Sequence, residues 1–267
     1  MSVYVDLTNR FNAGRLRAIL SSGQAVVLHR LAIMSKDGDW IVKEDDEALN
    51  HILRVLHQSG ARYRFGAPLD KRWLGGGWSS HFEFMQDQLR IRTDFVSRPP
   101  RIGTERLARI WIEQENRVPP FVDLVDLAEL KKTNREKDYA VIGELSRRIT
   151  AMEDKVRYSR SARELLDFYM SDPSAVVTIL GERGIGRDAL RNLESLEAAL
   201  DAERRRLIHA NEYRLARYAA AAQAWSEIWK DVERKITGIP LTEAHRVVVN
   251  RAEGVLPFRP PEEADHG

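Results

Sequence analysis

The two halves of the chain differ in their hydrophobic periodicity, and this contrast constrains the fold more than any other feature. Up to about residue 150, short segments with strand periodicity alternate with helical segments, whereas helical periodicity dominates the remainder. Such alternation is typical of a small α/β domain. The sequence therefore predicts an α/β (α+β) domain with a mixed sheet at residues 24–150, after an N-terminal helical segment at 1–23. An all-helical C-terminal domain at 151–256 and a flexible, proline- and acid-rich tail at 257–267 follow.

Local patterns assign elements within the first half. Helices are predicted at residues 11–22, 49–60 and 104–115, and strands at 62–65, 73–74, 81–85, 89–96 and 121–124. Residues 86–88 predict a hairpin between two of these strands. The apolar run at 24–34 is compatible with a strand or a buried helix, and Lys36-Asp37-Gly38-Asp39 after it predicts a turn.

Several helix-start signals follow from residue 126 onward. Asp126 is expected to cap a helix at residues 127–132, and Thr133 with Glu136 forms a capping-box pattern that starts a helix reaching Arg148. Further helices are predicted at 161–170 and 173–180, before a break at 181–186. Two long helices at 187–208 and 211–236 are expected to pack as an antiparallel pair.

A basic cluster joins two of these helices. Lys132 ends the first helix, Arg135 lies in the turn, and Lys137-Asp138 begins the second helix. In this arrangement the chain resembles the minimal nucleotidyltransferases over about residues 48–148. The resemblance implies a nucleotidyltransferase-like fold that transfers a nucleoside monophosphate from a nucleoside triphosphate to an unknown acceptor, with Mg²⁺. It also implies that Lys132 binds the nucleotide.

A glycine run follows the predicted strand at 73–74. Gly75, Gly76 and Gly77 lack the Cβ atoms that would keep a phosphate from backbone N–H groups, and Ser79 and Ser80 add hydroxyl donors. The run is similar to the Gly-Gly or Gly-Ser loop of the family, which implies a role in nucleotide binding. Three glycines also suit a tight turn or a close approach of two backbones.

In the resembling family, an Asp-x-Asp pair lies on the strand after this loop. Residues i and i+2 of a strand share one face, so the two carboxylates bind magnesium together. This chain has Arg92-Thr93-Asp94 there. The resemblance implies catalytic and metal-binding roles for Asp94 and for Asp123, and an arginine at position 92 could contact a phosphate directly. A second registration, with His81 and Glu83 facing the site, remains open.

The arginine at position 92 supports an alternative function. A fold that has lost its first metal-binding acid would be catalytically degenerate and would serve as a binding or regulatory module for a protein partner. Nucleic-acid binding by the arginine-rich stretch 90–109 is a third possibility, which a net charge of +2 does not favour. The chain has no cysteine and no run near the roughly 18 apolar residues of a membrane span, so we expect a cytoplasmic protein.

Overall fold

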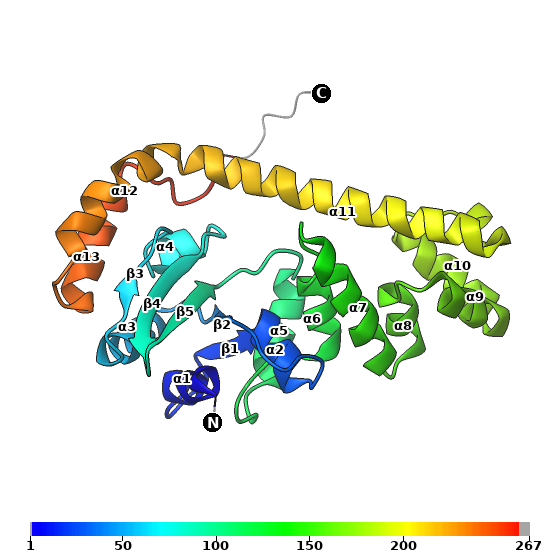
Figure 1. Ribbon diagram of the computed structural model, residues 1–267, viewed down its shortest axis with the longest axis horizontal. Coiled ribbons are helices and arrows are strands. Elements are labelled where there is room, and N and C mark those ends of the chain that lie inside the picture. Colours follow the sequence, from blue (N-terminus) through cyan, green and yellow to red (C-terminus); the bar gives the residue numbers. More distant parts are fainter. Residues whose placement is uncertain (1, 262–267) are drawn as a thin grey trace. The chain divides into compact units, whose positions relative to one another are not determined.

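The computed structural model describes residues 2–261, which form two compact units. The first unit combines residues 2–122 with 216–261, and the second unit is Asp123–Leu215 (Figure 1). This division differs from the boundary expected near residue 150, because the chain leaves the first unit at Val122 and returns to it at Ala216. Within residues 2–261, no helix combines the length and apolar character that crossing a bilayer requires.

The first unit contains a five-stranded sheet in the order β1-β2-β5-β4-β3. The strands are β1 (Ala18–Ser21), β2 (Asp37–Val42), β3 (Arg62–Tyr63), β4 (Ser80–Gln86) and β5 (Leu89–Val96). β2 and β5 are parallel and the other pairs are antiparallel, so the predicted mixed sheet is confirmed. The predicted hairpin joins β4 and β5. Asp87 and Gln88 have φ angles of 49° and 63°, as the two central residues of a type I′ turn require.

Seven helices of the first unit lie within the described residues. They are α1 (Val3–Phe11), α2 (Ser22–Leu28), α3 (Asp46–Gln58), α4 (Lys71–Leu74), α5 (Thr104–Glu113), α12 (Gln223–Ile236) and α13 (Leu241–Ala252). α3 and α5 confirm two predicted helices. The helix predicted at 11–22 is wrong. Asn12 ends α1 there, because its amide donates to the carbonyl of Ala18 and its side-chain oxygen accepts from the N–H groups of Arg17 and Ala18.

The region from Gln24 to Asp39 also differs from expectation. The apolar run begins within α2 and continues as an irregular segment, which resolves the choice between strand and helix for residues 24–28. The turn predicted at 36–39 is wrong, because Asp37 opens β2. Gly38 is needed for close packing within the strand, since a Cβ atom there would lie 2.4 Å from Trp40 and 2.5 Å from Tyr4.

The two faces of the sheet differ in composition, although both carry buried apolar residues: Ile19 and Ile41 are fully buried on the face that carries Asp39. One face packs into the main hydrophobic core, to which α3, α12 and α13 also contribute. The strand residues on this face include Leu20, Trp40, Tyr63, Phe82, Phe84, Ile91 and Phe95. Because successive side chains of a strand point to opposite faces, the residues between them project from the other face. That other face carries Asp37, Asp39, His81, Glu83, Arg92 and Asp94.

The glycine run, Gly75-Gly76-Gly77, forms the turn that directly follows α4 in the sequence. Residues 73–74 belong to α4, so the strand predicted there is wrong. Asp70 caps this helix by accepting from the Arg72 N–H at 2.9 Å. The C-terminal segment covers this turn: the indoles of Trp73 and Trp78 donate to the carbonyls of Leu256 and Pro257. Residues 257–261 of the expected tail contact the first unit, and residues 262–267 lie outside the described part of the chain; the flexibility of the tail stays a prediction.

The second unit is helical throughout, and the helical character predicted for residues 151–256 is confirmed. Its elements are α6 (Leu124–Leu130), α7 (Glu136–Arg148), α8 (Met152–Tyr158), α9 (Ala162–Ser171), α10 (Pro173–Glu182), η1 (Arg187–Arg191) and the first part of α11 (Leu193–Ala221). The strand predicted at 121–124 is wrong. Phe121 forms a single parallel bridge with Leu20, and α6 begins at Leu124 with Asp123, not Asp126, as its cap.

α11 replaces the predicted antiparallel pair of helices. It runs for 29 residues without a break where the pair was expected to turn, so that prediction is wrong. Asn211 is accommodated inside the helix because its amide donates to the Leu207 carbonyl one turn earlier and to the Lys132 carbonyl. The next helix, α12, begins at Gln223.

Candidate active site

A row of polar side chains crosses the sheet of the first unit. Asp39 on β2 pairs with Ser21 on β1 and with Asp94 on β5, and Asp94 pairs with His81 on β4. Directly paired residues on neighbouring strands lie about 5 Å apart and point to the same face. The sheet register therefore brings together residues that are separated by up to 73 positions in the sequence.

Asp37 and Asp39 form an Asp-x-Asp pair on β2. Their spacing of two residues sets both carboxylates on the polar face, and Asp94 is the register partner of Asp39. The pKa of Tyr4 on α1 reflects this negative charge. Burial raises the pKa of the Tyr4 hydroxyl, and the charges of Asp37, Asp39 and Asp94 raise it further. Three carboxylates thus act on one region of the sheet.

The Asp37 carboxylate lacks a partner for one of its atoms. Its Oδ1 is buried and accepts no hydrogen bond from the described residues. A buried carboxylate oxygen without a partner is costly, and native structures rarely leave one unexplained. A divalent cation would satisfy it, because Mg²⁺ prefers carboxylate oxygens and is usually held by only one or two of them. The unpartnered oxygen makes Asp37 a candidate metal ligand, with Asp39 two residues later on the same strand and Asp94 on the neighbouring strand.

The chain turns from β1 directly into α2 at Ser21-Ser22-Gly23, beside this pair. The Ser21 hydroxyl donates to the Asp39 carbonyl at 3.1 Å, and Ser22 has a left-handed φ of 51°. Gly23 approaches the segment before β2 so closely that a Cβ atom would lie 2.2 Å from the Ser35 hydroxyl. The amide of Gln24 donates to the carbonyls of Ser35 and Asp37. These contacts hold the turn against the start of the Asp-x-Asp strand.

His81 links Asp94 to a serine hydroxyl. Its Nδ1 lies 2.7 Å from Asp94 Oδ1, and its Nε2 lies 2.8 Å from the Ser79 Oγ. If the Nδ1–H group donates to the Asp94 carboxylate, Nε2 is left as the acceptor for the Ser79 hydroxyl. Arg64 adds a guanidinium 3.4 Å from Asp94 Oδ1. This arrangement orients an imidazole nitrogen to take a proton from a hydroxyl group.

A second polar row runs parallel to the first. Arg92 on β5 is the register partner of both Asp37 and Glu83, and Glu83 is the register partner of Arg62. The Arg62 guanidinium lies 2.7 Å from Glu83. Arg92 is thus the cation adjacent to the Asp-x-Asp pair, in a separate row from Asp39 and Asp94.

Some of the site residues predicted from the sequence lie on this face of the sheet, and others lie elsewhere in the structure. Asp94, Arg92, Ser79, His81 and Glu83 belong to it or to its margin, whereas Ser80 is fully buried and donates to the Ala67 carbonyl.

The glycines have a packing role in the structure. A Cβ atom on Gly76 would lie 1.8 Å from the Phe258 carbonyl oxygen, and one on Gly77 would lie 2.3 Å from the Tyr218 hydroxyl. Gly75 is similarly close to the Glu44 carboxylate. The chain's own atoms therefore occupy the space that a phosphate would need beside these residues.

Asp123 and Lys132 belong to the second unit. Asp123 accepts the Asp126 N–H at 2.8 Å as the cap of α6. Lys132 pairs with Glu129 at 2.7 Å and lies over the Tyr158 ring. Both side chains have clear structural roles there, and their part in a site with Asp94 stays a prediction.

Two members of the basic cluster that suggested the resemblance, Arg135 and Asp138, join a network around the buried Asp138 carboxylate. Thr133, Lys131 and Arg135 all bond this carboxylate. Burial alone would raise the pKa of Asp138, but the Thr133 hydrogen bond and the two cations hold it below its ordinary value. The predicted capping box does not form, because the Thr133 hydroxyl bonds Asp138, and α7 begins without a side-chain cap.

Asp37 and Asp39 are the residues that sequence reasoning missed. Lys-Asp-Gly-Asp has the composition of a turn, and this pattern concealed the carboxylate pair. The usable signal was the position of the pair at the start of the apolar run Trp40-Ile41-Val42, after a Ser-Ser-Gly segment.

No protein-family model and no curated protein matches the chain. Two solved structures from Helicobacter pylori show a weak likeness. One is a candidate nucleotidyltransferase, at 12% identity and a TM-score of 0.38, over 79% of this chain and 94% of the other. The second is the protein JHP933, also at 12% identity and a TM-score of 0.38, over 80% and 92% of the two chains. Similarity at this level carries no functional information, so the function has to follow from the geometry of the site.

Proposed function

We propose that this protein transfers a nucleoside monophosphate from a nucleoside triphosphate to an acceptor hydroxyl, with Mg²⁺ held by Asp37, Asp39 and Asp94. The observation that carries the proposal is the register of β2 against β5, which sets an Asp-x-Asp pair beside a third aspartate on the polar face. The unpartnered Oδ1 of Asp37 supports it. When bound, the metal supplies positive charge to the phosphate oxygens and orients them for displacement.

The protein's own residues have distinct tasks in this proposal. The turn at Ser21, Ser22 and Gly23 offers hydroxyl and N–H donors next to the carboxylates, and Arg92 offers a guanidinium to a phosphate oxygen. His81 receives the proton of the acceptor hydroxyl at Nε2, where it meets the Ser79 hydroxyl in the structure. Asp94 keeps the imidazole in the required tautomer through Nδ1.

The sequence left open a degenerate fold because Arg92 occupied the place expected for the first acid. The Asp-x-Asp pair on β2 supports transfer over the degenerate alternative, since an acid pair lies on the neighbouring strand. Arg92 then faces Asp37 across the β2–β5 pairing without displacing a carboxylate.

The test is the thermal midpoint of unfolding with each nucleoside triphosphate, with and without Mg²⁺. A ligand at 100 times its dissociation constant stabilises the native state by about 2.7 kcal/mol. We expect a magnesium-dependent rise for the native protein that Asp37→Asn abolishes. Asp46→Asn, which changes an exposed aspartate paired with Lys71, is the matched control and should retain the rise. If no triphosphate shifts the native protein at millimolar concentration, the proposal fails and the binding-module alternative stands.

A further inference from the structure

Ser79 lies directly before β4 and differs from several other serines in what its hydroxyl contacts. Main-chain carbonyls accept the hydroxyls of Ser59, Ser80, Ser146 and Ser226. The Ser79 Oγ instead lies 2.8 Å from His81 Nε2, and His81 Nδ1 lies 2.7 Å from Asp94 Oδ1. A serine is activated as a nucleophile when its hydroxyl contacts a base that a third group orients. Ser79 has this arrangement.

The surrounding chain fixes both members of this contact. A Cβ atom on Gly66 would lie 2.4 Å from His81 Cδ2, so the glycine allows the imidazole to lie against the backbone. The Ala67 N–H donates to the Ser79 carbonyl at 3.0 Å. The Arg64 N–H donates to the His81 carbonyl at 2.9 Å. Ser79 and His81 are therefore held on a hydrogen-bonded segment while both residues remain partly exposed.

This hydroxyl lies near the carboxylates that are proposed to hold Mg²⁺. Asp94 contacts His81 directly and is opposite Asp39 in the sheet register. Two hydrogen bonds and the width of one imidazole ring separate the Ser79 Oγ from the Asp94 carboxylate. A hydroxyl of the protein itself therefore occupies the place beside His81 that the proposed reaction assigns to the acceptor.

We propose that Ser79 is the acceptor, so that the protein attaches a nucleoside monophosphate to itself. This inference rests on the nucleotide transfer proposed above. The Ser79 Oγ attacks the α-phosphorus of the triphosphate, and the hydroxyl proton passes to His81 Nε2. The bond from the α-phosphorus to the oxygen that bridges it to the β-phosphate breaks, and pyrophosphate leaves with that electron pair. The product is a phosphodiester between Ser79 and the nucleoside, which fills the acceptor position and prevents further transfer.

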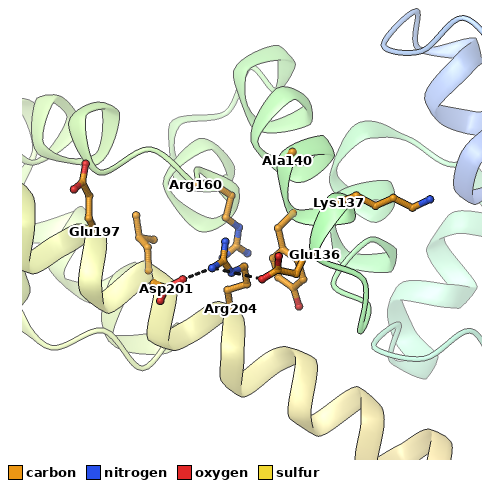
Figure 2. Close-up of a pocket in the computed structure, with 9 residues that line it drawn as sticks. Glu136, Lys137, Ala140, Arg160, Glu197, Asp201 and Arg204 are labelled. Atoms are coloured by element: carbon orange, nitrogen blue, oxygen red, sulfur yellow. Dashed lines mark hydrogen bonds and ion pairs between the residues drawn. The ribbon is translucent and has the colours of Figure 1, made fainter.

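A cavity of about 520 Å³ in the second unit is an alternative place for a nucleotide. Its lining includes three basic and three acidic side chains, which are Lys137, Arg160, Arg204, Glu136, Glu197 and Asp201 (Figure 2). Because these charges balance, the cavity has no net attraction for a triphosphate. Ala140 is an exposed residue of the same lining, so a change at Ala140 provides a control in the second unit.

The intact mass of the protein after incubation with Mg²⁺ and each nucleoside triphosphate tests the inference, and peptide mapping locates the adduct. We expect a single nucleoside monophosphate on Ser79 of each native chain, with pyrophosphate release that stops when every chain is modified. Dilution of the protein should not change the rate, because the transfer is intramolecular. Ser79→Ala should form no adduct but keep the magnesium-dependent rise in the thermal midpoint. Ser59→Ala and Ala140→Phe are the controls, and both should be modified like the native protein.

Diisopropyl fluorophosphate in EDTA tests the activation of Ser79 without metal or nucleotide. The serine oxygen attacks the phosphorus of this reagent, fluoride leaves, and the hydroxyl proton passes to His81. We expect labelling at Ser79 that Ser79→Ala abolishes and that His81→Gln slows by about 10²-fold or more.

The outcomes separate this inference from the proposed function. A magnesium-dependent rise in the thermal midpoint without an adduct on Ser79 overturns the inference and leaves the proposed function standing. No rise with any triphosphate overturns both. An adduct on another residue overturns the inference, as does a native protein that the fluorophosphate does not label at Ser79. Because the adduct is mapped in the native protein, the test remains decisive even if Ser79→Ala fails to fold.

Discussion

Asp39 and Asp94 are direct neighbours on two parallel strands, and both carboxylates project from the polar face of the sheet. Asp37 adds a third negative charge two residues before Asp39. Carboxylates held this close repel one another when no cation is bound. This repulsion is expected to lower the free energy of unfolding when no metal is bound, and urea unfolding in EDTA can measure the effect.

Asp37→Asn should leave the free energy of unfolding unchanged or raise it by up to about 1 kcal/mol in EDTA, because it removes repulsion and a buried charge. Urea unfolding in EDTA measures this. The contrasting variant is Asp70→Asn, which weakens the Asp70–Arg72 ion pair at the start of α4; its free energy of unfolding should not rise. Destabilisation by Asp37→Asn of 2 kcal/mol or more would mean that Asp37 is a structural residue.

His81→Gln should lower turnover without preventing nucleotide binding. General-base catalysis contributes about 10²- to 10⁴-fold, and glutamine cannot accept the proton that His81 Nε2 receives. Pyrophosphate release in single-turnover experiments measures the chemical step, and the nucleotide-induced rise in the thermal midpoint measures binding. Equal loss of both would instead assign His81 to binding or folding. His57→Gln, at an exposed position on α3, is the control.

The buried pair of Tyr63 and His245 predicts a pH dependence of stability. The Leu69 N–H donates to the Tyr63 oxygen at 3.1 Å, so the Tyr63 hydroxyl donates to His245 Nδ1 at 2.7 Å. Burial lowers the pKa of His245 below its ordinary value. The unfolded chain therefore binds this proton more readily than the folded chain does. The contribution of His245 is complete above about pH 6.5 and declines as the pH falls below it.

Urea unfolding between pH 7.5 and pH 5.0 tests this dependence. The free energy of unfolding of the native protein should fall more steeply with decreasing pH than that of His245→Gln, which has no group to protonate. His57→Gln should follow the native curve. Parallel curves for the native protein and His245→Gln would exclude His245 as the titrating group.

Gly76→Ala should destabilise the first unit by about 1–3 kcal/mol, the usual cost of overpacking. The new Cβ atom would lie 1.8 Å from the Phe258 carbonyl oxygen, so the C-terminal segment has to move away. The matched change is Gly103→Ala, where no atom lies within 4 Å and where φ is negative. If both variants unfold at the same urea concentration, the C-terminal segment does not hold this position in solution.

Local signals predicted some parts of the fold well. β5 matches its predicted bounds because Leu89, Ile91, Thr93 and Phe95 alternate with polar residues, and alternation needs no knowledge of the partner strand. Gly38 led to the wrong prediction of a turn at residues 36–39. Glycine is required there because a Cβ atom would collide with Tyr4, 34 residues away in the sequence. Asn211 misled the prediction in the same manner, because one of its partners is the carbonyl of Lys132, 79 positions earlier.

The candidate site was harder to predict than its individual strands. Asp94 was identified from the sequence, but its neighbours depend on the strand order, which puts β2 beside β5 although two helices and two strands separate them along the chain. The register that sets Asp39 opposite Asp94 is a property of the assembled sheet. Residue spacing alone does not contain it.

The core of the first unit includes side chains from opposite ends of the sequence. Trp225, Trp229 and Leu241 belong to the same hydrophobic cluster as Phe11, Trp40 and Phe95. During synthesis the five strands leave the ribosome long before α12 and α13, and the whole second unit emerges between them. The helical unit can therefore complete its fold first, while the sheet that carries the candidate active site keeps part of its apolar face uncovered until α12 and α13 have been translated.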